Sequence, residues 1–283
     1  MLEYIKILII SLFSSLFAPL AASSSAHFTF LNYILDFSKD EKQIGFYFSI
    51  ISLIFFCAAI FFVRKIYAKG FMSLGKKSSA NLKNAKGYRT MMQSLLISLI
   101  PAVLMFVPVS KEKFLCDVLF DYFSASNILI SAFCSIAGGF MLIIALWYSK
   151  NKKGNTKKSS KKSDVLRLSI YQIPAYIFPG FSHVTSAATS LTLDMVDERV
   201  IMRETLLYIA PSGFVISLFR VIRFILAGVA LDPVMIVICV VAALVGNIIM
   251  LNIVSHLNIR KTFLFFGIYS IIFGLAVGVI AFV

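Results

Sequence analysis

Acidic residues are scarce in this sequence. Only 13 of its 283 residues are Asp or Glu, against 27 Lys or Arg, and charged residues of both signs make up 14%. Soluble domains carry about 25% charged residues. Because the sequence is also 59% hydrophobic, the deficit of charge excludes an ordinary soluble domain and indicates an integral membrane protein.

Cysteines are scarce too. The sequence has four, Cys57, Cys116, Cys134 and Cys239, and their spacing is typical neither of a disulfide framework nor of a zinc site. Three of them lie within apolar runs, so we expect them to be packing residues.

Apolar runs long enough to cross a hydrocarbon core of about 30 Å predict six spanning helices. They cover residues 45–63, 91–109, 127–148, 205–228, 233–254 and 262–283. Two further apolar stretches, 5–35 and 168–195, are each interrupted near the middle by Pro, Ser and His. Since half of such a stretch is too short to span, each is predicted to form a re-entrant helical hairpin.

Positive charge gathers in short loops beside the spans. Residues 64–90 hold eight Lys or Arg and no acid, and residues 149–167 are similarly basic with Asp164 as the one acid. Such loops are typical of the cytoplasmic side and favour anionic lipid headgroups, so a nucleic-acid partner is not expected. With Lys76 and Lys158 inside, both termini and the loop that holds Asp117 are predicted to lie outside.

This threading gives a single membrane domain, 1–283, in two halves of opposite orientation. The first half is 1–148 with hairpin 5–35, the linker is 149–167, and the second half is 168–283 with hairpin 168–195. The predicted fold is therefore all-α, an inverted-topology repeat whose broken segments meet near the midplane. Irregular backbone at that depth is tolerated only where it is buried in protein or lines a polar cavity, so the two breaks are the predicted functional site.

The two breaks are rich in hydroxyl and imidazole groups. The first, within "PLAASSSAHFTF", supplies Ser23, Ser24, Ser25 and His27, and the second, "PGFSHVTSAATS", supplies Gly180, Ser182, His183, Thr185 and Ser186. Such donors at half-helix N-termini suit an oxyanion, and phosphate is the natural choice. The alternative is that Ser and Thr only cap the broken helices and that packing holds the histidines. The matching places of the two breaks in opposite halves favour the oxyanion site.

The first hairpin also has features of a signal peptide. Residues 7–17 are a plausible apolar region and "APLAA" a plausible cleavage site, but Glu3 and Lys6 cancel and leave no net positive charge before them. Cleavage would remove the symmetry partner of the second hairpin, so we expect the segment to be retained.

Both breaks carry known motifs. "PLAASSSAH" is similar to Pro-Val-Ser-Ser-Thr-Gly-His with Ser23, Ser24 and His27 in register, and "PGFSHVT" keeps Pro179, Gly180 and Ser182 of Pro-Gly-Thr-Ser-Arg-Ser-Gly. Arg203, Pro211 and "FGIYSIIFGL" also fall on matching positions. Over nearly its whole length the sequence resembles the undecaprenyl pyrophosphate phosphatase family of the bacitracin-resistance type. The resemblance implies action on a polyprenyl diphosphate lipid in the bacterial plasma membrane.

The sequence departs from the family at the positions that carry its metal ligands and arginines. The resemblance implies two glutamates that hold a divalent cation, Mg²⁺ or Ca²⁺, but Ser14 and Ala18 occupy those positions. His183 replaces the motif arginine, and Ser270 replaces the arginine of a Tyr-Arg pair. Serine hydroxyls are weak neutral ligands for Mg²⁺. The sequence therefore predicts no metal ligands and a pocket better suited to binding than to hydrolysis.

The resemblance implies that Ser24 and His27 are the candidate catalytic residues, as a nucleophilic or proton-transfer pair in which the imidazole activates the serine. The predicted phosphate-binding residues are Ser23, Ser25, Gly180, Ser182, His183, Thr185 and Arg203. Three functions stay open: an impaired homologue that binds or translocates polyprenyl phosphate, an active phosphatase with relocated metal ligands, and a transporter of an unrelated solute. The expected partners are a polyprenyl phosphate or diphosphate and membrane lipids, and a homodimer stays open.

Two arginines within a predicted span have no role in the motifs. Arg220 and Arg223 lie on one helical face, where a lipid-facing charge would be unfavourable. We expect them to snorkel to the outer interface, with a phosphate-facing position as the alternative.

Overall fold

The computed structural model describes residues 1–75, 82–110, 113–122, 127–151, 156–229, 231–257 and 259–282. Lys76 and part of the predicted linker, residues 152–155, lie outside these ranges. The described residues form helices α1 (Leu2–Phe17), α2 (Ser24–Leu35), α3 (Glu41–Gly75), α4 (Leu82–Ser98), α5 (Ile100–Met105), α6 (Leu115–Tyr122), α7 (Ile128–Asn151), α8 (Lys162–Ile177), α9 (His183–Leu193), α10 (Glu198–Leu226), α11 (Pro233–Val254) and α12 (Ile259–Phe282).

Six segments of the described chain are long and apolar enough to cross a membrane. They are Glu41–Ser73, Gly87–Met105, Ile128–Asn151, Glu198–Leu226, Pro233–Val254 and Arg260–Phe282. Each overlaps one of the six runs predicted from the sequence, so the all-α, multi-pass membrane class is confirmed. The second segment is divided between α4 and α5, with Pro101 in the first turn of α5.

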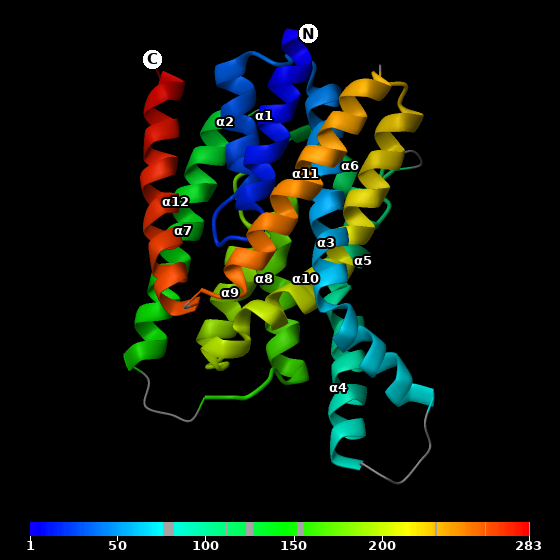
Figure 1. Cartoon of the computed structure of the whole chain (residues 1–283), viewed down its shortest axis with the longest axis vertical. Coiled ribbons are helices and arrows are strands. Elements are labelled where there is room, and N and C mark those ends of the chain that lie inside the picture. Colours follow the sequence, from blue (N-terminus) through cyan, green and yellow to red (C-terminus); the bar gives the residue numbers. More distant parts are fainter. Residues whose placement is uncertain are drawn as a thin grey trace.

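Both interrupted stretches form two short helices. In the first, α1 and α2 are separated at residues 18–23, and in the second, α8 and α9 are separated at residues 178–182. Both termini lie at one end of the molecule, opposite the end of α3 and the start of α4 (Figure 1). Which of these two ends faces the cytoplasm stays a prediction. The re-entrant course of the hairpins, the inverted repeat and the division into halves stay predictions.

Close packing between helices depends on glycine. A Cβ at Gly139 of α7 would lie 2.6 Å from the carbonyl oxygen of Gly267 on α12, and one at Gly274 would lie 2.6 Å from that of Ala132. Small residues at such contacts allow two membrane helices to approach closely. The α7–α12 pair is thereby fixed, and α12 carries Tyr269 toward the first break.

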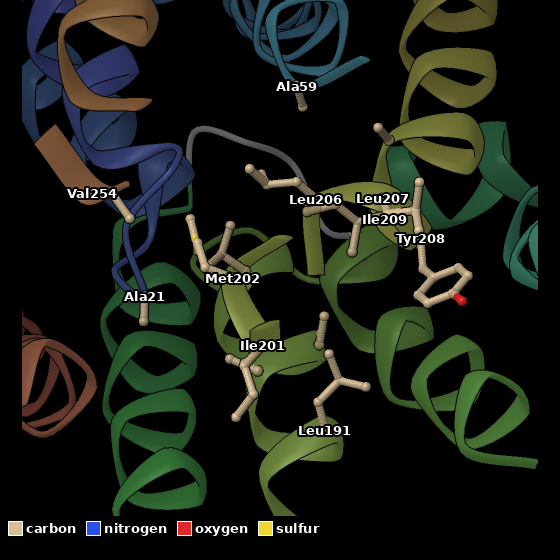
Figure 2. Close-up of a cluster of buried hydrophobic side chains, with 14 of the residues drawn as sticks. Ala21, Ala59, Leu191, Ile201, Met202, Leu206, Leu207, Tyr208, Ile209 and Val254 are labelled. Carbon is tan, nitrogen blue, oxygen red and sulfur yellow. The ribbon is translucent and has the colours of Figure 1, made fainter. Parts of the chain in front are cut away.

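The largest buried apolar cluster surrounds the ends of both hairpins. Figure 2 shows side chains of α9 and α10, among them Leu191, Ile201 and Leu206, gathered near Ala21 of the first break and Ala59 of α3. Interiors packed in this way hold side chains in fixed rotamers. The first break and the base of the second hairpin are therefore embedded in this cluster.

Candidate functional site

The first break ends where Ser23 caps helix α2. Ser23 has an extended backbone, and its Oγ accepts a hydrogen bond of 3.1 Å from the amide of Ala26. Serine is one of the preferred residues at this position, because its side chain satisfies an amide that has no partner within the helix. The Oγ atoms of Ser23 and Ser25 lie 3.0 Å apart. Ser23, a predicted phosphate-binding residue, thus serves in the cap.

The second break is built in a similar way. Helix α8 ends at Ile177, because Pro179 disfavours helical backbone at the residue before it. Ser182 then caps α9, and its Oγ accepts a hydrogen bond of 3.2 Å from the amide of Thr185. The side chain of Thr185 is buried, and its amide is the donor in this cap. In both breaks a serine therefore caps the helix that follows.

The two breaks are in direct contact. The amide of Gly180 donates a hydrogen bond of 2.7 Å to Oγ of Ser25, and both groups are buried. Gly180 has a φ of +90°, and a Cβ there would lie 2.2 Å from the carbonyl oxygen of Ser131 on α7. Glycine is therefore required at this junction, both for its backbone conformation and for the close approach of α7.

A small cavity lies between the breaks. Its volume is about 50 Å³, which is room for a few water molecules or one phosphate-sized group. The polar side chains on its wall are Ser24, Ser25, Ser52, Tyr176, Ser182, His183 and Arg220, and most of the remaining wall is aromatic or aliphatic. The structure thus brings together four hydroxyl or imidazole side chains that the sequence predicted, two from each break.

His183 is oriented by Gln172, which the sequence analysis did not identify. Nε2 of Gln172 donates to the carbonyl oxygen of His183 at 2.7 Å, and the amide oxygen is 3.1 Å from Nδ1 of the same residue. Because that oxygen can only accept, Nδ1 of His183 donates, which leaves Nε2 of the ring to act as acceptor when neutral and donor when charged. A lone glutamine eleven residues before the histidine is the signal that could have identified it.

His27 faces away from this cavity. Its ring is stacked between Phe17 and Phe273, with centroid distances of 3.6 and 4.1 Å, and its side chain is 5% exposed. Nδ1 is 2.5 Å from the carbonyl oxygen of Ser23, and Nε2 is 2.7 Å from the hydroxyl of Tyr269. Both ring nitrogens are thus engaged by neighbours other than Ser24. The structure does not bring Ser24 and His27 into a hydrogen-bonded pair, and a catalytic role for either stays a prediction.

Arg203 lies elsewhere. It lines a separate cavity with Ser160, Lys161 and Tyr208, at the beginning of α10. Arg220 is seventeen residues further along the same helix, about 25 Å at 1.5 Å per residue, so one phosphate cannot contact both arginines. A contribution of Arg203 to the cavity between the breaks is therefore not supported.

Arg220 turns into the protein, and the expected snorkelling is wrong for this residue. Its Nη2 donates to the carbonyl oxygen of Tyr176 at 3.0 Å, in the last turn of α8 beside the second break. Arg223 instead pairs with Asp117 of α6 at 3.3 Å. The sequence showed that both arginines share a helical face, but the packing of α8 against α10 determines which one reaches the cavity.

The described residues do not fit a divalent cation at this cavity. Ala18 lies on its wall, but Ser14 is completely buried and is not among the lining residues. No carboxylate lines the described cavity, and across the described chain no group of three or more His, Cys, Asp and Glu could hold a metal. Mg²⁺ and Ca²⁺ require oxygen ligands, carboxylates above all, and the guanidinium of Arg220 repels them.

A network of charges joins the two ends of the second hairpin. Asp164, in the first turn of α8, accepts from Lys157 at 2.9 Å and from Arg167 at 3.0 Å, and Arg167 also pairs with Asp194 at the end of α9 at 2.8 Å. Burial disfavours the Asp164 carboxylate, but the hydrogen bonds from Lys157, the Lys161 amide and Arg167 outweigh it and lower its pKa. The network fixes the base of the hairpin whose other end forms the cavity.

Comparison with known proteins gives two findings. The family model described as "Bacitracin resistance protein BacA" matches residues 7–276. The chain is also similar to the protein named "Undecaprenyl-diphosphatase 1" of Clostridium acetobutylicum, with 23% identity over 278 residues, which cover 98% of this chain and 96% of that protein.

Proposed function

Because the chain belongs to the bacitracin resistance protein BacA family, we propose that its cavity between the two breaks binds the phosphate end of a polyprenyl phosphate or diphosphate lipid. We further propose that metal-dependent hydrolysis of the diphosphate is impaired. The observation that carries the proposal is the hydrogen bond between Ser25 and Gly180, which makes one site from two segments far apart in the sequence.

The chemistry of the cavity supports binding of an anion. Ser24 and Ser25 lie in the first turn of α2 and His183 begins α9, so the N-terminal ends of both helices border the cavity. Helix N-termini favour negative charge because their amides and the helix dipole point toward it. The hydroxyls add further donors, and the apolar wall suits a ligand whose other end is a hydrocarbon chain.

Weak hydrolysis is expected because this chain lacks the two glutamates that the family resemblance implies. Ala18 and the buried Ser14 replace the two glutamates, and the imidazole of His27 is engaged by Ser23 and Tyr269. Phosphoryl transfer to water requires charge neutralisation at the phosphate and a group that orients the water. The cavity retains donors for the phosphate but has no described carboxylate for a metal.

A binding measurement tests the proposal. Purified protein in nanodiscs is titrated with a polyprenyl monophosphate and with the matching neutral polyprenol, and bound lipid is measured by native mass spectrometry. We expect the phosphate to bind more tightly, and Ser25→Ala to weaken it about tenfold, since a hydrogen bond to a charged group contributes about 1.5–3 kcal/mol. Ser49→Ala is the matched control, because Ser49 is buried but bonds only its own helix at Gly45. Equal binding of phosphate and polyprenol would contradict an anion site.

A second measurement tests the impairment. Phosphate release from the polyprenyl diphosphate, with and without Mg²⁺ or Ca²⁺, should be far below that of a homologue with both glutamates. Single substitutions Ser14→Glu or Ala18→Glu should restore almost nothing, because catalytic groups that act as a unit are strongly non-additive. The two combined with His183→Arg should raise metal-dependent release. Robust turnover by the unmodified chain would indicate an active phosphatase with other metal ligands.

A further inference from the structure

The cavity between the breaks holds one permanent charge. Among the described residues on its wall, Arg220 is the only side chain that is always ionised, and the other polar groups are hydroxyls and the imidazole of His183. Arg220 also borders a second cavity beside α6, where the carboxylate of Asp117 pairs with Arg223, but Asp117 does not line the cavity between the breaks. A cation among hydroxyls without a carboxylate on the same wall is an environment suited to an anion.

The position of Arg220 is fixed at the second break. Its Nη2 donates to the carbonyl oxygen of Tyr176 at 3.0 Å, and Tyr176 in turn shares a hydrogen bond of 2.9 Å with Ser212 on α10. A guanidinium carries several N–H donors in a planar fork, so it can hold a backbone carbonyl and a phosphate oxygen at once. The contact with Tyr176 thus orients the fork in advance and reduces the entropy lost when an anion binds.

We propose that Arg220 is the residue that gives this cavity its specificity for a phosphate end group, with the guanidinium supplied by α10 while α9 carries His183. The inference rests on the binding function proposed above. Arg220 and His183 line the same cavity from different helices, and His183 stands where the family motif has an arginine. An arginine at position 220 on α10 or at position 183 on α9 can donate to the same phosphate. The two positions are therefore interchangeable as the place of the charged donor.

An exchange of the two positions tests the inference. Binding of polyprenyl monophosphate and of neutral polyprenol is measured in nanodiscs for the parent, Arg220→Met, the double variant Arg220→Met/His183→Arg, and Arg64→Met. Arg64 is the matched control, because it also donates to a backbone carbonyl, that of Phe61 at 2.8 Å, but lies on the exposed surface of α3.

We expect Arg220→Met to weaken phosphate binding by about tenfold or more, as charge-assisted hydrogen bonds are the strong ones, and to leave polyprenol binding unchanged. The double variant should regain most of the phosphate affinity, and Arg64→Met should match the parent. A purely structural role for Arg220 would reduce binding of both lipids equally and would not be rescued by an arginine at position 183, which would overturn the inference.

The outcomes separate this inference from the proposed function. If the parent prefers phosphate over polyprenol and Arg220→Met keeps that preference, the role of Arg220 is wrong and the anion site stands. If the parent shows no preference, the proposed function fails. If Arg220→Met does not fold, Arg220→Gln and Arg220→Lys replace it. Loss of the preference for phosphate over polyprenol in Arg220→Gln, together with its retention in Arg220→Lys, supports the inference. An equal preference in both variants contradicts it.

Discussion

Replacing Gly180 with alanine should disrupt the junction between the two breaks. Gly180 has a φ of +90°, and an added Cβ would lie 2.2 Å from the carbonyl oxygen and 2.5 Å from Cα of Ser131. Both neighbours are backbone atoms of α7, so no side-chain rotation can relieve the contact. The junction must move, and the hydrogen bond from Gly180 to Ser25 is then lost or distorted.

The magnitude follows from three contributions. A non-glycine residue in a disfavoured backbone region costs about 1–3 kcal/mol, overpacking of a filled interior costs about 1–3 kcal/mol, and a lost hydrogen bond costs about 1 kcal/mol. We therefore expect Gly180→Ala to lower the free energy of unfolding by about 3–7 kcal/mol.

Two other glycines separate these contributions. Gly228 has a φ of +70° but open space around it, so Gly228→Ala should cost only the backbone strain, about 1–2 kcal/mol. Gly87 lies in helix α4, also in open space, and Gly87→Ala should be neutral or stabilising by about 0.5–1 kcal/mol. The three variants are compared by denaturant unfolding of the detergent-solubilised protein, with tryptophan fluorescence and circular dichroism as probes.

The difference between Gly180→Ala and Gly228→Ala isolates the contact with Ser131 and the junction itself. If the two variants lose the same stability, α7 does not press on the second break and the geometry of the junction is wrong. Gly180→Ala should also weaken binding of polyprenyl phosphate, whereas Gly228→Ala should not.

Three further predictions concern the second hairpin and the basic linker before it. Asp164→Asn should destabilise the protein by about 1.5–3 kcal/mol at neutral pH, because the buried carboxylate loses its charge-assisted hydrogen bonds with Lys157 and Arg167. Since the pKa of Asp164 is lowered on folding, this contribution is complete above about pH 4 and is lost as the pH falls through the folded value, so parent and variant should converge in acid unfolding titrations. Gln172→Leu should release the ring of His183 and weaken phosphate binding several-fold with little change in polyprenol binding, whereas equal loss for both lipids would indicate a packing defect. A single cysteine at Lys158 should resist labelling by an impermeant reagent in intact cells, and labelling there would overturn the cytoplasmic position of the basic loops.

The positions of spans and breaks are determined by the sequence itself. Hydrophobic length predicts a spanning helix, and each of the six apolar runs overlaps a helical segment long and apolar enough to span. Pro179 and Gly180 end one helix, while Ser23 and Ser182 begin the next, through local rules of backbone conformation and capping. Such rules involve atoms only a few residues apart, so they can be read from the sequence without knowledge of the fold.

Which side chains share the cavity was decided by tertiary structure. Ser24 and His27 are three residues apart in one motif, yet Ser24 borders the cavity while His27 packs against Tyr269 and Phe273 of α12. Arg220, outside every motif, reaches the cavity because α10 packs beside the end of α8. The rotation of a helix about its own axis and the choice of its neighbours depend on contacts between distant segments, such as the close approach of α7 and α12, and neighbouring residues of the chain do not specify them.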